Sequence, residues 1–137
     1  MSDRYRAGLD TLFALSRDGP SLIGDGLAAE APEFARLLVE FAFADIFPRP
    51  GLDRRTRLFA AIAALAAQGK APAQLRWFVR AALDAGASRG EVIEALMQVA
   101  VFAGFAAAAE ALEACRDLLA DQASGDGRAC PVPSAAR

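Results

Sequence analysis

The sequence contains no histidine and only two cysteines in 137 residues. Zinc and non-haem iron sites in proteins are built mainly from imidazole and thiolate ligands, so a metal site here would have to rely on carboxylates and thiolates alone. Cys115 and Cys130 are fifteen residues apart and form neither a CxxC redox pair nor a metal-ligand spacing. We therefore expect no bound transition metal, and thiols that suit a reducing compartment.

Long apolar runs and an excess of charge are also missing. The longest uncharged stretches, residues 58–69 and 92–109, fall short of the ~20 apolar residues of a membrane-spanning helix, and Glu94 interrupts the second. Fifteen basic and 17 acidic residues leave a formal charge of −2, so nothing electrostatic favours nucleic acid or an anionic membrane as a partner. The charged start, MSDRYRAGLD, lacks the apolar core of a signal peptide. We expect a cytoplasmic protein with no membrane or nucleic-acid partner.

Strand-favouring residues are scarce, whereas alanine is common and hydrophobic residues make up 55% of the chain. This composition predicts an all-α fold, a compact bundle of six or seven helices. The length is that of one domain, which we place at residues 1–121. Residues 122–137 include Ser, Gly and Pro and no large aromatic or aliphatic residue beyond one Val, and we expect this tail to be disordered.

Apolar periodicity, prolines and capping residues locate the helices. Pro32 and Pro72 suit the first turn of a helix, Asp53 suits a cap, and Gly69 suits a left-handed terminus. The stretch from Ser88 to Glu91 has the pattern of a capping box, the most specific local signal in the chain. The expected helices are 3–17, 31–47, 53–68, 72–85, 89–103 and 105–120.

Two patterns concern helix faces. In the helix at 31–47, one stripe holds Phe34, Leu37, Leu38, Phe41 and Ile46. The helices at 57–68 and 91–103 are apolar almost all round, which a small isolated bundle cannot offer to water. We therefore expect a homo-oligomer that buries apolar surface of these two helices.

Three segments in order resemble the carboxymuconolactone decarboxylase family. Residues 43–57, FADIFPRPGLDRRTR, are similar to its helix-end signature, and residues 74–94, QLRWFVRAALDAGASRGEVIE, and 97–107, MQVAVFAGFAA, are similar to its two further blocks. The opening YRAGL at residues 5–9 also resembles the start of the decarboxylase branch. The resemblance covers about residues 4–120.

The resemblance implies an all-helical bundle that assembles into rings, a trimer or commonly a hexamer, with an active-site pocket near a subunit boundary. The decarboxylase is a lyase that works without metal or organic cofactor. It removes CO₂ from a lactone that carries a carboxylate. A cation can hold that carboxylate, and an acid or base must manage the proton on the developing enolate. Relatives of the alkyl hydroperoxide reductase D type instead use a CxxC pair, a glutamate and a histidine.

Several of these groups are replaced here. Phe78 stands where the family block carries its histidine, and Phe102 where many members have tyrosine. Ala71 and Gln74 stand at the CxxC positions of the reductase type. A peroxidase function is disfavoured because the nucleophile is missing.

Asp45 and Arg49 remain as candidate catalytic residues. Asp45 keeps an acid where the signature has glutamate, and Arg49 keeps the arginine of the Arg-Pro-Gly loop. In one interpretation Arg49 holds a substrate carboxylate while Asp45 orients it or moves a proton. In the other, the two form a water-exposed ion pair at a helix end.

The candidate substrate-binding residues are mostly aromatic, since a ligand pocket needs large apolar walls and few polar groups. The same residues at helical spacing also fit an ordinary core. They are Phe47, Gln74, Trp77, Phe78 and Phe102.

Two functions stay open. The chain is either a cofactor-independent enzyme acting on a small, largely apolar cyclic or unsaturated acid or lactone, or a catalytically silent relative that binds a hydrophobic ligand or acts as an oligomer scaffold. A phenyl ring at 78 makes a pocket drier and carries no proton. We therefore expect γ-carboxymuconolactone itself to be a poor substrate, and a bulkier, less polar acid to bind.

Overall fold

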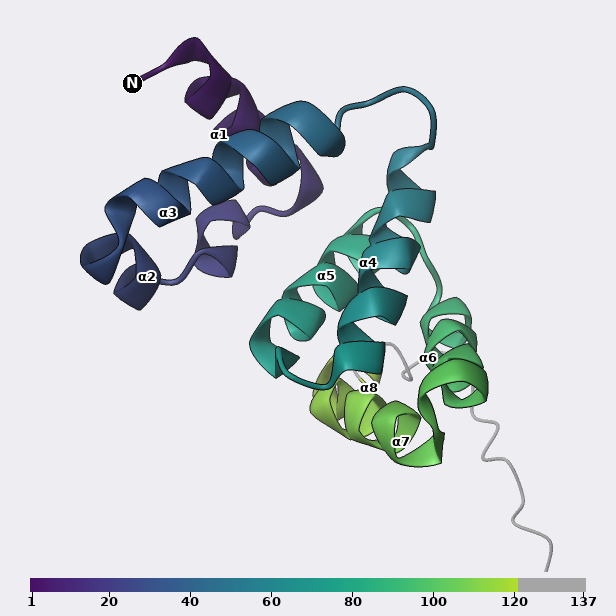
Figure 1. The fold of residues 1–137 in the computed structure, drawn as a ribbon. Helices are drawn as coiled ribbons and strands as arrows, with labels where there is room; N and C mark the ends of the chain where they lie inside the picture. Colours follow the sequence, from purple (N-terminus) through teal and green to yellow (C-terminus); the bar gives the residue numbers. More distant parts are fainter. Residues whose placement is uncertain (121–137) are drawn as a thin grey trace, which may run out of the picture.

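The computed structural model describes residues 1–120, and over this range it contains helices and turns but no strand (Figure 1). This confirms the all-α prediction. The expected tail 122–137, with Cys130, lies outside the described residues. The α-helices are α1 (Asp3–Leu15), α2 (Asp25–Glu30), α3 (Pro32–Leu38), α4 (Arg54–Gln68), α5 (Pro72–Asp84), α6 (Arg89–Ala103), α7 (Phe105–Ala114) and α8 (Arg116–Ala120). A 3₁₀ helix, η1 (Gly19–Leu22), and a π-helix, η2 (Val39–Ile46), complete the described part.

The helix count within residues 1–120 exceeds the six or seven predicted. The segment 105–120 is not one helix, because the chain leaves helical geometry at Cys115 with φ −106° and ψ 9°. The segment 31–47 begins as α3 and continues as η2, in which hydrogen bonds span five residues, as in the bond from Phe47 N to Ala42 O at 2.9 Å. A π-helix of this length is rare, and π segments occur often at functional sites.

The predicted caps are confirmed. Asp53 accepts a hydrogen bond from Thr56 N at 2.7 Å. At the start of α6, Ser88 Oγ accepts from Glu91 N at 3.0 Å and Glu91 Oε2 accepts from Ser88 N at 2.8 Å, which completes the capping box. Gly69 ends α4 at φ 65°, a left-handed conformation that glycine adopts without strain. These local signals determine where α4 begins and ends and where α6 begins.

The helices form two groups in space (Figure 1). α1 lies along η2 beside α2 and α3, while α4 to α8 pack together in the second group. One hydrophobic cluster draws on both groups, from Leu12 in α1 to Leu119 in α8. No helix among residues 1–120 is long and apolar enough to span a membrane.

The apolar stripe of residues 31–47 points mainly outward. Phe34, Leu37 and Phe41 are 61%, 51% and 63% exposed, whereas Ala35 and Val39 are buried. The reason is the close approach of α1. A Cβ added at Gly8 would lie 2.6 Å from the Val39 carbonyl oxygen, so only small contacts fit between these helices.

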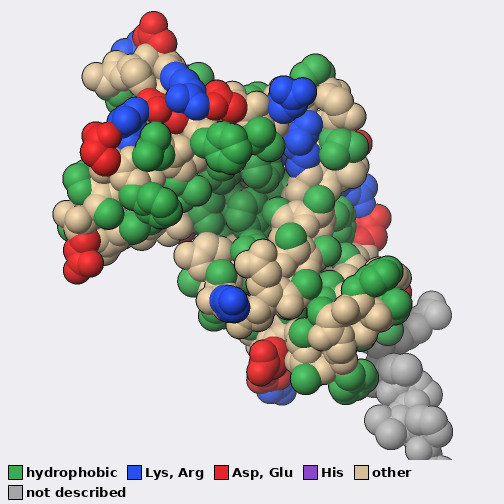
Figure 2. Space-filling view, viewed as in Figure 1, with side chains coloured by type: hydrophobic (Ala, Val, Ile, Leu, Met, Phe, Trp, Pro, Cys, Tyr) green, Lys and Arg blue, Asp and Glu red, His purple; other side chains and the backbone are tan. Residues whose placement is uncertain are grey.

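Apolar surface also remains open on α6 and α7. Met97, Val101, Phe102 and Phe105 are all at least half exposed in the single chain. In α4, by contrast, the exposed apolar residues are small alanines. Figure 2 shows further hydrophobic side chains gathered in the hollow between the two helix groups.

Candidate functional site

Asp45 lies near the end of η2 and is bound by a partner from the other end of the chain. Arg4 Nε donates to Asp45 Oδ1 at 3.0 Å, and Arg4 Nη2 forms a second ion pair with Oδ2. The hydrogen bond from Arg4 is the main reason that the pKa of Asp45 is lowered below its ordinary value. The Asp45 side chain is 39% exposed. Its partner in the single chain is therefore Arg4 rather than Arg49.

A buried carboxylate that sequence reasoning missed lies next to this pair. Glu40 in η2 is 3% exposed and accepts hydrogen bonds from Ser2 Oγ at 2.7 Å and Arg36 Nη1 at 2.8 Å. Arg4 Nη1 lies 3.4 Å from it, so Arg4 bridges Glu40 and Asp45. The hydrogen bond from Ser2 is the largest cause that lowers the pKa of Glu40, with Arg36 and Arg4 adding to it against the opposing effect of burial.

Two signals could have identified Glu40. It is the lone charge in the apolar run after Leu37, and Arg36 precedes it by four residues, the spacing of an ion pair along a helix. Its contacts with Ser2 and Arg4 join positions 38 and 36 residues apart, and no local pattern predicts such pairs.

The Arg-Pro-Gly loop is held through its backbone. Arg57 Nη2 donates to the Arg49 carbonyl oxygen at 3.0 Å. Arg57 Nε is buried and has no acceptor among residues 1–120. The Arg49 side chain is exposed and takes part in none of the ion pairs found in that range. The loop therefore combines an exposed guanidinium with a buried donor that lacks a partner.

Three of the predicted substrate-binding residues meet in an aromatic cluster. Phe47 stacks on Phe43 with centroids 5.2 Å apart and on Phe78 at 5.9 Å. The Trp77 ring meets Phe78 edge-on at 4.9 Å and Phe43 at 6.3 Å. Trp77 and Phe78 are only 6% and 8% exposed, and Trp77 Nε1 donates to the Asp18 carbonyl at 3.1 Å. These rings fill the core between the two helix groups.

The other two predicted residues lie apart from the cluster in the single chain. Phe102 is 84% exposed at the end of α6, and Gln74 is exposed in the first turn of α5. Their roles in ligand binding stay predictions.

The hollow nearest the Arg-Pro-Gly loop is small and mixed in character. A cavity of about 260 Å³ is lined by Phe47 and Pro48, by residues of α1 that include Asp10, and by Arg54. Arg54 Nη1 donates to the Ala14 carbonyl oxygen at 3.2 Å, which ties the start of α4 to α1. Neither Asp45 nor Arg49 lines this cavity.

The arrangement favours binding of an anion over transfer of a proton. A carboxyl group with a lowered pKa is ionised at neutral pH, so Asp45 is a poor proton donor there. Arg49 can pair with a carboxylate in two hydrogen bonds. Within residues 1–120, no three acidic or cysteine side chains gather into a group that could hold a metal ion.

Two curated proteins are similar to this chain over part of its length. Over 86 residues the chain is 41% identical to an uncharacterised 15.0 kDa protein of the nqo9–nqo10 intergenic region of Paracoccus denitrificans, covering 62% of this chain and 64% of that protein. Over 89 residues it is 30% identical to 4-carboxymuconolactone decarboxylase of Acinetobacter baylyi, covering 65% and 66%. The chain thus spans about two thirds of the length of the curated relatives it matches.

The model of one family matches most of the described helices. It covers residues 32–117, from the start of α3 into α8, and so includes Glu40, Asp45, the Arg-Pro-Gly loop and the aromatic cluster. This chain belongs to the carboxymuconolactone decarboxylase family.

Proposed function

We propose that this chain is a catalytically silent member of its family, a cytoplasmic homo-oligomer that binds a small hydrophobic ligand or serves as a scaffold. The observation that carries the proposal is the position of Phe78. Where the family block has a histidine, a phenyl ring is packed against Trp77 and Phe47 and is 8% exposed. No group at this position can exchange a proton with a substrate.

The remaining acid does not replace the histidine. Decarboxylation leaves an enolate that must be protonated, and the best catalytic acid has a pKa near the working pH. The hydrogen bond from Arg4 lowers the pKa of Asp45, which moves it further from neutral pH. Arg4 also contacts both carboxylate oxygens of Asp45. The site therefore keeps groups that bind an anion and lacks one that completes the reaction.

The exposed apolar surface supports the oligomer. Phe34, Phe41, Phe102 and Phe105 each leave more than half of the side chain exposed. Since burial of an aromatic side chain covers ~150–250 Å², these four rings supply a large part of the ~800 Å² that each partner buries in a standard interface. A trimer or hexamer built on these surfaces would keep the rings out of water.

A cofactor-independent decarboxylase-like enzyme is the second candidate, and one observation favours it. Arg57 Nε is a buried donor without an acceptor among residues 1–120, and the guanidinium of Arg49, whose carbonyl oxygen contacts Arg57, takes part in no ion pair in that range. The carboxylate of a small, largely apolar cyclic or unsaturated acid or lactone would supply acceptors for both. The name of the Acinetobacter baylyi relative points to the same class of substrate.

An assay of CO₂ release from 4-carboxymuconolactone separates the two candidates. The silent protein should give no turnover above the buffer rate, and the Arg49→Ala variant should not differ from wild type. Turnover at ~1 per second or faster that is lost in Arg49→Ala would replace the silent function with the enzyme.

Light scattering at micromolar concentration tests the oligomer separately. Wild type should be larger than a monomer, and Phe102→Glu, which places a charge on the exposed apolar surface, should reduce its mass. Gln74→Glu, at an exposed polar position on α5, is the matched control and should leave the mass unchanged. A monomeric wild type would contradict the oligomer.

A further inference from the structure

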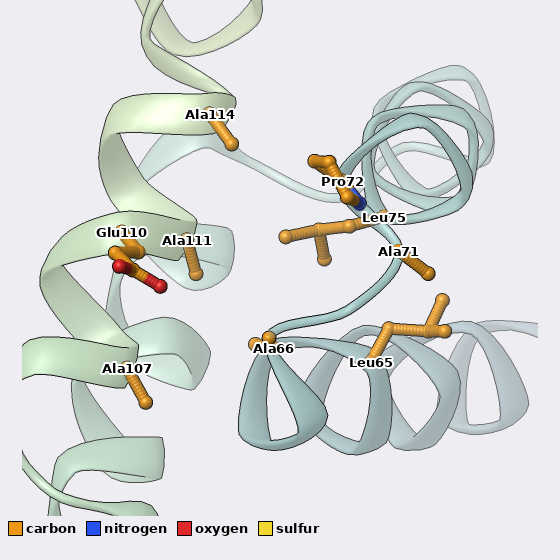
Figure 3. Close-up of a pocket in the computed structure, with 10 residues that line it drawn as sticks. Leu65, Ala66, Ala71, Pro72, Leu75, Ala107, Glu110, Ala111 and Ala114 are labelled. Carbon is orange, nitrogen blue, oxygen red and sulfur yellow. The ribbon is translucent and has the colours of Figure 1, made fainter.

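A second cavity lies away from the Arg-Pro-Gly loop, between α4, α5 and α7 (Figure 3). Its volume is about 240 Å³ and it is partly open to solvent. Apart from Gly69 and one glutamate, every lining residue is apolar. They are Leu65, Ala66, Ala71, Pro72, Leu75, Ala107, Ala111 and Ala114.

The local sequence explains why this space is empty. Gly69 ends α4 and Pro72 begins α5, so the chain reverses in a turn too short to cover the angle between the two helices. α7 crosses this angle with alanines at 107, 111 and 114, whose methyl groups cannot fill it (Figure 3). The walls of the cavity are formed by the helices α4, α5 and α7.

Glu110 is the one charged residue in the lining. Its Oε2 lies 3.9 Å from the point where a Cβ on Gly69 would be, so the carboxylate reaches across from α7 to the end of α4. None of the ion pairs within residues 1–120 involves Glu110 or the neighbouring Lys70. The carboxylate is therefore available to a ligand.

The end of α4 adds to the negative potential at this point. α4 is 15 residues long, and its C-terminus carries the negative end of the helix dipole together with carbonyl groups that have no helical partner. Among the last four carbonyl groups of α4, the Leu65 carbonyl is the one that accepts a hydrogen bond within residues 1–120, from Gly69 N at 3.1 Å. The last turn of α4 contains no basic residue, and the nearest cation in sequence is Lys70, which follows the C-cap Gly69. A carboxylate and a helix C-terminus together favour a cation.

We propose that the cavity between α4, α5 and α7 binds a small organic cation, with its ammonium group on Glu110 and its hydrocarbon part among the alanines. The volume sets the size of the ligand. A buried apolar cavity of ~150 Å³ holds benzene, so about 240 Å³ holds an aromatic ring with a short alkyl chain. An arylalkylammonium ion with about nine non-hydrogen atoms fits both the shape and the charge. This site shares no residue with the Asp45 and Arg49 region and does not depend on the proposed function.

The probe is phenethylammonium chloride. Calorimetric titration measures its affinity, and methyl NMR of protein labelled at alanine locates its contacts. A ligand of this size should bind with a dissociation constant roughly in the micromolar to low-millimolar range. The alanine methyl signals that shift should be those of the lining, namely Ala66, Ala71, Ala107, Ala111 and Ala114. Two matched probes separate charge from shape, because 2-phenylethanol is neutral and phenylacetate is an anion of similar size. We expect the order cation, then alcohol, then anion.

Three variants locate the contacts. Glu110→Gln removes the charge and keeps the shape, and it should weaken phenethylammonium about tenfold, the effect of one charge-assisted hydrogen bond, while leaving 2-phenylethanol unchanged. Glu113→Gln, on the outer side of the same helix, is the control and should bind like wild type. Ala107→Leu fills the cavity and should abolish binding of both compounds.

Four outcomes would overturn the proposal. Equal binding of the cation and the alcohol would make the cavity a simple apolar hole. Equal effects of Glu110→Gln and Glu113→Gln would mean that only the overall charge matters. Loss of oligomer mass in Ala107→Leu without any binding by wild type would show that a second copy covers the cavity. Absence of saturation at millimolar probe would remove the site.

Discussion

Replacing Phe78 by histidine puts the residue type of the family block into a space built for a phenyl ring. Phe78 is 8% exposed, with Trp77 at 4.9 Å and Phe47 at 5.9 Å between ring centroids. Part of the ~1.5–3 kcal/mol gained by burying the phenyl ring is lost, and an imidazole nitrogen without a partner costs ~1–3 kcal/mol. We expect Phe78→His to lower the free energy of unfolding at pH 7.5 by about 2–4 kcal/mol.

The same substitution adds a titration that wild type lacks, because the chain has no histidine. Burial among aromatic rings disfavours the imidazolium, so the folded-state pKa of the introduced group falls below the unfolded value of about 6.5. Between these two pKa values the unfolded chain binds more protons, and the free energy of unfolding therefore falls as the pH falls. For a folded-state pKa depressed by two units or more, the extra loss from pH 7.5 to pH 5.5 is about 1.4 kcal/mol.

Urea unfolding followed by circular dichroism at pH 7.5, 6.5 and 5.5 measures this effect, at one fixed protein concentration because subunit association shifts apparent stability. Phe78→Leu is the matched control, since it also loses the ring contacts but adds no titrating group. Its stability difference from wild type should not change with pH. If Phe78→His loses no more stability than Phe78→Leu on going to pH 5.5, position 78 is not in a dry environment and the reasoning fails.

Three further predictions concern local features. Gly8→Ala should destabilise by about 1–3 kcal/mol in thermal unfolding, because the added Cβ would lie 2.6 Å from the Val39 carbonyl oxygen and 2.7 Å from its Cγ1. Gly26→Ala in α2, where no atom lies within 4 Å, should instead be neutral or stabilise by up to about 1 kcal/mol; equal effects of the two changes would contradict the close α1–η2 contact. Ser88→Ala removes the capping box of α6 and should cost about 1 kcal/mol in the same assay. In a Cys130→Ser background, the buried Cys115 thiol, whose pKa is raised to about 11 by burial, should react with an aromatic disulfide reagent only in denaturant; fast labelling of the folded protein would show that this part of the chain opens.

Most helix limits could be predicted because they depend on residues close in sequence. Asp53 and Ser88 cap their helices through hydrogen bonds that reach only three residues. Gly69 and Pro72 act through their own backbone conformations. The inner face of α5 was also predictable, since Leu75, Phe78 and Val79 are buried as their spacing indicates. Each of these features needs only local information.

The faces of α3 and η2 could not be predicted, because another helix decides them. An apolar stripe on a helix usually faces the core, yet the large side chains of this stripe are mainly exposed. The close contact of Gly8 with Val39 instead buries a face with smaller side chains. The change to π geometry after Leu38 further shifts the positions that share a face. In one interpretation of the sequence, Asp45 forms a helix-end ion pair with Arg49, four residues away. The structure instead pairs Asp45 with Arg4, which comes from 41 residues away.

Phe78 in the aromatic cluster and the ion pair of Asp45 in η2 both leave the site with fewer groups that can donate a proton. A lactone decarboxylase needs a cation for the substrate carboxylate and a donor for the enolate proton. This chain keeps cations at Arg49 and Arg57, and its family model extends across both. At the same time Phe78 removes one donor, and Arg4 keeps Asp45 ionised. In the proposed silent function, restoring one group alone should therefore not restore turnover. An imidazole at position 78 would lie among packed aromatic rings, and releasing Asp45 from Arg4 would also disturb Glu40, which Arg4 contacts as well. The proposal thus predicts that a Phe78→His variant still releases no CO₂ from 4-carboxymuconolactone.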